Sequence, residues 1–135
     1  MARKRIFILD GHPAEQSLSR SFAETYGERA RAAGHDVQIA HLHALSFDPD
    51  FGQGNYQSWK PLEPDLQKVL EQVEWSEHLV VTLPLWWGGL PARLKGLFDR
   101  VLLPGRAFDT RVTRMGMPTP LLRPFFLSTV RWSSG

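Results

Sequence analysis

The sequence predicts a single α/β domain with a doubly wound parallel sheet in three layers. Short apolar runs of strand type alternate with helical patterns, in the order strand, helix, strand, helix, strand, helix. The segments between successive strands are long enough for crossover connections, which parallel pairing requires. A length of 135 residues suits one domain of roughly 100–200 residues, so a second catalytic domain is not expected.

Three elements are expected in the first third of the chain. Residues Arg5–Asp10 contain a continuous apolar run that stops at Gly11, which is typical of a strand buried on both faces. Apolar residues then recur every four positions, which predicts a helix with Ser17 as its N-cap and Gly34 just beyond its end. Polar and apolar residues alternate over Asp36–Leu42, which indicates a second strand nearer an edge of the sheet.

The middle of the chain combines a long loop with two more helices and a third strand. Residues Phe47–Pro64 are rich in glycine and proline, and the aromatic residues of this loop are expected to pack against the domain: Phe51, Tyr56 and Trp59. Pro64 suits the first position of a helix, and His78–Leu83 is typical of a buried strand. A third helix is expected between Pro91 and Pro104.

The pattern weakens beyond Asp109, so residues 110–135 form an atypical tail. Met115–Pro120 is expected to be turn-like, and Phe125–Val130 is a candidate fourth strand. The net charge is only +2, and we interpret the arginines of the tail as solvating charges. No nucleic-acid partner is therefore expected.

Two features of the composition exclude whole classes of function. The chain has no cysteine, which excludes a disulfide framework, a thiolate zinc site and a cysteine nucleophile. No apolar run approaches the roughly 18 residues of a membrane-spanning helix, and the basic start Met1–Arg5 does not lead into a longer apolar stretch. We therefore expect a cytoplasmic protein without membrane insertion, with peripheral association as an open alternative.

Ligands of open parallel sheets bind at the carboxyl ends of the strands, which directs attention to two loops. The first loop contains His12, Ser17, Leu18 and Ser19 just before and within the start of a helix. Helix N-terminal N–H groups and serine hydroxyls suit an anion such as phosphate. The alternative is that Ser17 only caps its helix and Gly11 only turns the chain, and the loop alone does not decide between them.

The second loop places Trp86 and Trp87 beside Gly88 and Gly89. A ligand can approach the backbone of glycine closely, so two tryptophans beside glycines could form a wall for a flat aromatic ligand. The alternative is that the tryptophans cover apolar surface between helices. A doubly wound sheet would bring the two loops side by side, so together they predict a phosphate seat next to an aromatic ledge.

These motifs resemble a known family. They are Gly11-His12-Pro13 with Ser17 and Ser19, the long run Leu83–Val101, and Pro104–Phe108. Over about Arg5 to Leu122, the sequence resembles the NAD(P)H:quinone oxidoreductase family of flavodoxin-like flavoproteins. The resemblance implies a flavodoxin-like fold and an NAD(P)H dehydrogenase (quinone)-like enzyme. Its noncovalent FMN or FAD would take a hydride from NAD(P)H and pass it to a quinone-like acceptor, and the protein would be a homodimer.

The resemblance also implies which residues would hold the flavin. The phosphate side would be held by His12, Ser17, Leu18 and Ser19. The isoalloxazine ring would be lined, partly through backbone groups, by Pro84, Leu85, Trp86, Trp87 and Gly88. No catalytic acid or base is identified, because the usual candidates of the family have no counterpart here, and no metal site is implied.

The resemblance is weaker at the C-terminus. Beyond the fourth strand, members of the family continue into a glycine-rich flavin loop, a last helix and a fifth strand, and the residues up to Gly135 do not supply these three elements. We therefore expect a sheet that lacks the last strand and helix, in a domain shortened at its C-terminus. Such a chain could instead be a regulatory subunit of the same family, for example of a potassium-efflux system, and a flavodoxin-type electron carrier is the third alternative.

Three smaller expectations concern single side chains. His41 and His43 could be imagined as metal ligands, but without a third ligand at a fitting spacing we interpret them as ordinary residues at a strand end. Asp99 and Arg100 are expected to be a solvated or capping pair. Neither a P-loop signature nor Gly-x-Gly-x-x-Gly is present, which argues against nucleotide hydrolysis and a Rossmann-type dinucleotide site.

Overall fold

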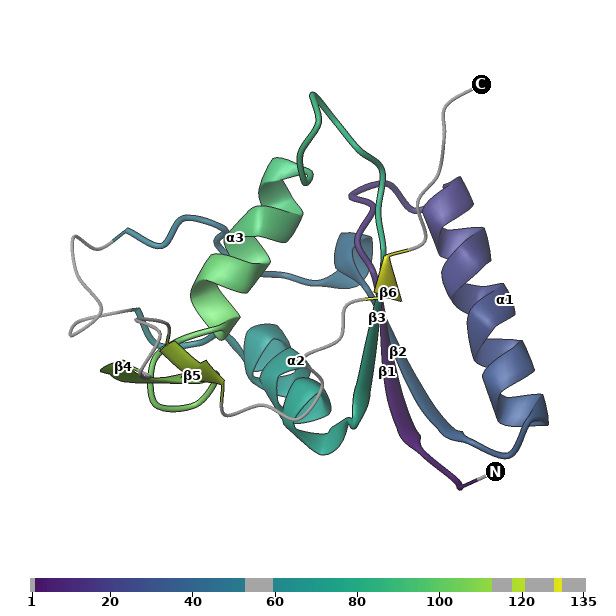
Figure 1. The fold of residues 1–135 in the computed structure, drawn as a ribbon. Helices are drawn as coiled ribbons and strands as arrows, with labels where there is room; N and C mark the ends of the chain where they lie inside the picture. Colours follow the sequence, from purple (N-terminus) through teal and green to yellow (C-terminus); the bar gives the residue numbers. More distant parts are fainter. Residues whose placement is uncertain (1, 53–59, 113–117, 121–127, 130–135) are drawn as a thin grey trace.

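A four-stranded parallel sheet organises the chain, which a computed structural model describes at residues 2–52, 60–112, 118–120 and 128–129 (Figure 1). The strands lie in the order β2, β1, β3, β6. Their bounds are Arg5–Asp10 for β1, Asp36–His41 for β2, His78–Thr82 for β3 and Ser128–Thr129 for β6. The predicted α/β architecture with a doubly wound parallel sheet is confirmed.

Strand β1 lies at the centre of this sheet and pairs in parallel with β2 on one side and β3 on the other. It begins and ends where the sequence predicts, and every residue after Arg5 is buried. Strand β2 is at the edge of the sheet, as expected, and ends at His41 because Leu42–Ala44 turn into a 3₁₀ helix. Strand β3 ends one residue before its predicted end, at Thr82.

Helices cover both faces of the sheet, which makes three layers (Figure 1). Helix α1 (Leu18–Ala32) lies on one face, and α2 (Pro64–Trp75) and α3 (Ala92–Val101) lie on the other. Alternate residues of a strand point to opposite faces, so the core divides into two clusters. The α1 side contains Ile6, Ile8, Ala23, Ala30 and Val80. The larger α2 and α3 side includes Phe7, Leu9, Leu66, Leu70, Leu94 and Leu97.

The ends of α1 follow the predicted chemistry. The Oγ of Ser17 accepts a hydrogen bond from the N–H of Arg20 at 3.0 Å, so Ser17 is the N-cap. Beyond the last turn, Gly34 adopts a φ of +92°, a backbone conformation that residues with a Cβ rarely adopt. The helix therefore begins and ends at positions set by its local sequence.

The long loop packs along α3 through its first residues. Phe47 is buried in the larger cluster, and the guanidinium of Arg93 lies 4.3 Å from the centre of its ring. One turn further along α3, Gly96 faces Pro49 so closely that a Cβ on Gly96 would lie 2.5 Å from the Pro49 carbonyl oxygen. The start of the loop therefore packs against α3, and Phe51, the first of the three aromatic residues expected to pack, is half-buried and lines a hollow together with Phe98 of α3. Tyr56 and Trp59, also expected to pack, lie outside the described residues.

The region after α3 differs from the expectation. Strands β4 (Phe108–Val112) and β5 (Pro118–Pro120) pair antiparallel as a separate two-stranded ribbon. The prediction of a turn over Met115–Pro120 is therefore wrong at residues 118–120. Proline is compatible with an edge strand, because the N–H group that it lacks is not needed to bond a neighbouring strand there. The rest of that segment lies outside the described residues.

Strand β6 lies inside the predicted segment Phe125–Val130 and pairs in parallel with β3, with Val80 opposite Ser128. The fourth strand is therefore confirmed at Ser128 and Thr129, while the other residues of the segment are outside the described part of the chain. No helix within the described ranges is long and apolar enough to cross a membrane.

The contact between Gly96 and Pro49 predicts a specific loss of stability. We expect Gly96→Ala to lower the free energy of unfolding by about 1–3 kcal/mol, since the new Cβ would collide with backbone that cannot move away without distorting the loop. Denaturant unfolding of the purified protein measures the change.

Gly27→Ala is the matched control, because Gly27 also lies inside a helix. A Cβ there would approach 2.7 Å from the Cδ1 of Ile39, which is the far end of a flexible side chain and can turn away. The gain in helix propensity, about 1 kcal/mol, then offsets the contact. Equal stability of the two variants would contradict the proposed role of the Gly96 contact.

Candidate functional site

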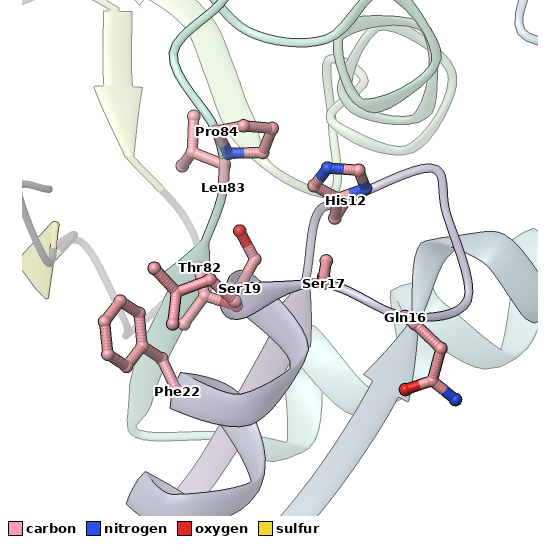
Figure 2. A pocket seen from close by; sticks show the side chains of 9 residues that line it. His12, Gln16, Ser17, Ser19, Phe22, Thr82, Leu83 and Pro84 are labelled. Carbon is pink, nitrogen blue, oxygen red and sulfur yellow. The ribbon is translucent and has the colours of Figure 1, made fainter. Parts of the chain in front are cut away.

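A hollow of about 200 Å³ opens at the carboxyl ends of β1 and β3, where α1 begins (Figure 2). We call it the α1 hollow. The chain leaves β1 toward α1 on one face and leaves β3 toward α3 on the other, which is the switch point where open α/β sheets bind ligands. The hollow is lined by His12, Gln16, Ser17, Leu18, Ser19, Phe22, Thr82, Leu83 and Pro84.

A hydrogen bond within its own loop selects one tautomer of the His12 ring. The Nδ1 atom accepts a hydrogen bond from the N–H of Ala14 at 2.9 Å, so Nδ1 of the neutral ring carries no proton. The proton is then on Nε2, which makes His12 a donor at the edge of the α1 hollow. A neutral N–H donor is suited to a phosphate oxygen.

The backbone of the first loop is fixed by the buried carboxylate of Asp10, which is 1% exposed. Its Oδ1 accepts the N–H of His12 at 3.2 Å, and its Oδ2 contacts the Nδ1 of His41 at 2.8 Å. Both oxygens of a buried acid are thereby paired, as burial requires. His41 therefore has a partner inside the fold, and no group of three or more metal-ligating side chains is found within the described ranges.

The start of α1 supplies further donors to the hollow. Ser17 uses its Oγ to cap the helix, and the same side chain also borders the hollow, where its hydroxyl proton can donate. In the described part of the chain, no acceptor contacts the N–H groups of Leu18 and Ser19. These are the first amides of a helix, which lack intrahelical partners and favour anions.

The second loop forms a tight two-residue hairpin at Trp86–Gly89, which we call the aromatic hairpin. Trp86 and Gly89 exchange both backbone hydrogen bonds at 3.0 Å. The two residues between them have positive φ, +53° at Trp87 and +75° at Gly88, as a type I′ turn requires. A tryptophan in the left-handed region is uncommon, and such strain is found mainly at functional positions.

The aromatic hairpin is exposed. The exposed fraction is 61% for Leu85 and 46% for Trp86, and Trp87 is fully exposed. Trp87 therefore covers no apolar surface between helices, which was the alternative to a ligand wall. Trp86 instead contacts the first loop, because its ring meets the ring of His12 edge to face with centroids 5.6 Å apart.

The structure brings most of the candidate residues together, in two adjoining parts. His12, Ser17, Leu18, Ser19 and Pro84 line the α1 hollow, whereas Leu85, Trp86, Trp87 and Gly88 lie on the exposed loop beside it. Sequence reasoning missed four residues that also line the hollow: Gln16, Phe22, Thr82 and Leu83. The position of Thr82 at the end of a strand, on the face that α1 covers, was the signal that could have identified it.

A family model for the flavodoxin-like fold matches residues 4–122 of the chain. The chain belongs to this flavodoxin-like family. The match covers β1, β2 and β3, the helices α1, α2 and α3, the α1 hollow and the aromatic hairpin. The resemblance identified from the sequence motifs is confirmed at the level of the fold and the family.

Relatives of this flavodoxin-like chain are named as oxidoreductases. The uncharacterized NAD(P)H oxidoreductase YcaK of Escherichia coli (strain K12) is 30% identical over 112 residues, which cover 80% of this chain and 57% of the relative. NAD(P)H dehydrogenase [quinone] 1 of Cavia porcellus is 29% identical over 126 residues, 79% of this chain and 46% of the relative. The chain thus spans about half the length of the curated relatives it matches.

A solved structure shows the same fold. The NAD(P)H:quinone oxidoreductase from Methanothermobacter marburgensis superimposes with a TM-score of 0.69 at 32% sequence identity. The similarity covers 85% of this chain and 62% of that chain. The flavodoxin-like sheet and its helices are therefore shared with a protein of that name.

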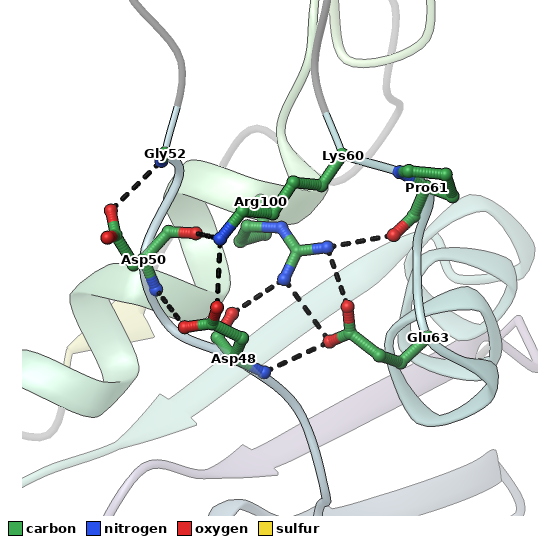
Figure 3. A network of polar contacts seen from close by, with 7 residues as sticks. All are labelled: Asp48, Asp50, Gly52, Lys60, Pro61, Glu63 and Arg100. Carbon is green, nitrogen blue, oxygen red and sulfur yellow. Dashed lines mark hydrogen bonds and ion pairs between the residues drawn. The ribbon is translucent and has the colours of Figure 1, made fainter.

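A second polar cluster of this flavodoxin-like domain lies around Arg100, away from the α1 hollow (Figure 3). Arg100 is 2% exposed. Its Nη2 donates to the Glu63 carboxylate at 2.8 Å and to the Pro61 carbonyl at 3.0 Å, and its Nη1 donates to the Asp48 carbonyl at 2.6 Å. The expectation of a solvated Asp99–Arg100 pair is wrong, because Arg100 joins both ends of the long loop while Asp99 pairs with Lys95 on the surface.

The cluster shifts the ionisation of two carboxylates. The hydrogen bond from Arg100 lowers the pKa of Glu63 below its ordinary value of 4.5. The hydrogen bond from Lys60 similarly lowers the pKa of Asp48. A carboxylate whose pKa is lower in the folded state stabilises the fold above its unfolded pKa, and this stabilisation is lost as pH falls through the folded value.

The stability of the domain should therefore decrease on acidification below about pH 4.5, the ordinary value for Glu63. We expect Glu63→Gln to be less stable than wild type at neutral pH and to show a flatter decline under acid, because it removes one group that must bind a proton on unfolding. Urea unfolding at several pH values between neutral and acid measures both effects.

Glu28→Gln is the control, since Glu28 forms no ion pair with the described residues. It should retain the slope of wild type. A Glu63→Gln variant that declines as steeply as wild type would show that Glu63 does not contribute to the acid response.

Proposed function

We propose that the chain is a flavin-dependent oxidoreductase that holds FMN or FAD, takes a hydride from NAD(P)H and reduces a quinone-like acceptor. The observation that carries the proposal is the junction of two parts: a donor-lined hollow at the start of α1 and an exposed aromatic hairpin, joined by the contact of His12 with Trp86. The names of the relatives support the reaction class.

The residues of the candidate site suit two different parts of a flavin, its ribityl-phosphate arm and its ring. A hollow of about 200 Å³ is smaller than the roughly 300–1,000 Å³ typical of whole-ligand sites, so it suits only the ribityl-phosphate arm. The N–H groups of Leu18 and Ser19, the hydroxyls of Ser17 and Ser19 and the imidazole of His12 are donors suited to that arm. The ring would then lie outside the hollow, along the aromatic hairpin.

The aromatic hairpin has two amides to offer the ring. The N–H groups of Trp86 and Gly89 bond within the hairpin, which leaves the N–H groups of Trp87 and Gly88 as donors. Placed at the pyrimidine edge of the ring, such donors would favour the negative charge of the reduced form. A bound flavin supplies the hydride chemistry itself, and the chain supplies the position, the stacking surface and these donors.

We propose a homodimer as the active form. Among the residues with described side chains, the exposed large apolar ones gather around the proposed ring position, and they are Leu18, Leu85, Trp86, Trp87 and Leu90. A second copy would cover this surface and enclose the space above the ring, where NAD(P)H and acceptor must stack. Sedimentation equilibrium checks the proposal, and a purely monomeric flavin-loaded protein would refute it.

We also propose a cytoplasmic location.

The decisive experiment is a spectrum of the purified protein after incubation with excess FMN or FAD and desalting. We expect flavin absorbance to remain with the protein and to bleach when NAD(P)H is added under anaerobic conditions. Retained flavin without bleaching would support the alternative of a regulatory subunit over an enzyme. If neither flavin is retained or has its fluorescence quenched, the proposed function is wrong.

Variants of the aromatic hairpin test the proposed ring position. Gly88→Val should weaken flavin affinity by at least about tenfold, because a branched residue at a φ of +75° strains the turn and sets a side chain where the ring would approach. Trp86→Ala should also weaken affinity by removing stacking surface. Flavin fluorescence titration measures both.

Gly89→Ala is the matched control within the same turn. A Cβ at Gly89 would meet only the Trp86 carbonyl oxygen, at an ordinary distance of 3.8 Å, and Gly89 does not have a positive φ. Its flavin affinity should stay close to that of wild type. Unchanged affinity in both Gly88→Val and Trp86→Ala would remove the hairpin from the site.

A further inference from the structure

Thr82, the last residue of β3, carries a buried polar group that the fold itself does not use. The residue is 2% exposed, and its Oγ1 atom has no hydrogen-bond partner in the structure. Buried hydroxyls nearly always have a partner, so an unpaired one needs an explanation. The carbonyl oxygen of Thr82, in contrast, has a partner, since it accepts the N–H of Gly11 at 2.7 Å.

The neighbours of Thr82 in the sheet show why its hydroxyl is left over. Asp10 is opposite His41 on one side and opposite Thr82 on the other. Side chains at paired positions of a sheet point to the same face, here the face that α1 covers. Asp10 uses one oxygen for His41 and the other for the N–H of His12, so neither is directed to Thr82.

The surroundings of the Thr82 side chain also indicate what it could bind. Thr82 lines the α1 hollow together with Ser17 and Ser19 (Figure 2). Ser17 and Ser19 belong to the start of α1, whose free N–H groups favour an anionic or oxygen-rich group. The side chain that carries the unpaired hydroxyl therefore lines the space that the proposed function gives to the ribityl-phosphate arm of the flavin.

We propose that the Thr82 hydroxyl donates a hydrogen bond to an oxygen of the ribityl-phosphate arm, which makes Thr82 a binding residue in addition to those carried over from the family motifs. The inference rests on the proposed flavin site. It implies that the apo fold keeps an unpaired hydroxyl which only the ligand pairs. Replacing that hydroxyl should therefore have opposite effects on the free protein and on flavin binding.

The test compares Thr82→Val with Thr82→Ser in the full chain. Valine has nearly the shape of threonine but no hydroxyl, and serine keeps the hydroxyl. We expect the dissociation constant for FMN, from fluorescence titration, to rise about tenfold in Thr82→Val and to stay within about threefold in Thr82→Ser. We expect the thermal midpoint of flavin-free Thr82→Val to equal or exceed that of wild type, since its methyl group needs no partner.

Riboflavin, which lacks the phosphate, identifies the acceptor. A loss in Thr82→Val that persists with riboflavin assigns the bond to the ribityl chain, and a loss seen only with FMN assigns it to the phosphate. Unchanged FMN affinity in Thr82→Val, or an equal loss in Thr82→Ser, would overturn the proposal, as would a lower midpoint of the flavin-free valine variant. The two failures are distinguishable. If wild type binds neither FMN nor FAD, the proposed function itself is wrong. If wild type binds flavin and Thr82→Val binds it equally well, only the role of Thr82 is wrong.

Discussion

The close approach of the ends of β1 and β3 is the constraint on which the rest of this domain depends. The N–H of Gly11 donates to the Thr82 carbonyl at 2.7 Å, and a Cβ on Gly11 would lie 2.9 Å from that oxygen and 2.6 Å from the Cδ2 of Leu94. Only glycine lets the first loop leave the sheet at this point without displacing β3 or α3. The α1 hollow, the contact of His12 with Trp86 and the packing of α3 all follow from that junction.

Local patterns were sufficient to predict the layers of the fold. Apolar runs located β1 and β3, four-residue periodicity located α1, and Ser17 and Gly34 marked its ends, because these features depend on residues near one another in sequence. The ribbon of β4 and β5 was not predictable in the same way, since proline at 118 and 120 indicates a turn and only the pairing partner makes it a strand.

The candidate site was predictable as a pair of loops but not in its polar detail. Motifs located His12, Ser17 and the tryptophans, whereas Asp10, Thr82 and Arg100 were overlooked or misjudged. Each of these three is nearly completely buried, and its environment is set by residues distant in sequence, such as His41 for Asp10 and Glu63 for Arg100. The periodicity of a sequence does not indicate a partner that is distant along the chain. From one sequence alone, a buried arginine such as Arg100 therefore cannot be distinguished from an arginine at the surface.

The left-handed Trp87 has a consequence for engineering this fold. A glycine or asparagine would adopt the φ of +53° more readily, so tryptophan at this position costs the domain on the order of 1 kcal/mol. A selection for thermal stability alone would tend to discard the indole, because its exposed ring stabilises nothing within the described residues. Mutant libraries designed to stabilise this domain therefore need a second screen that measures the function of the Trp87 indole. Without it, the selected variants will gain stability by losing that side chain.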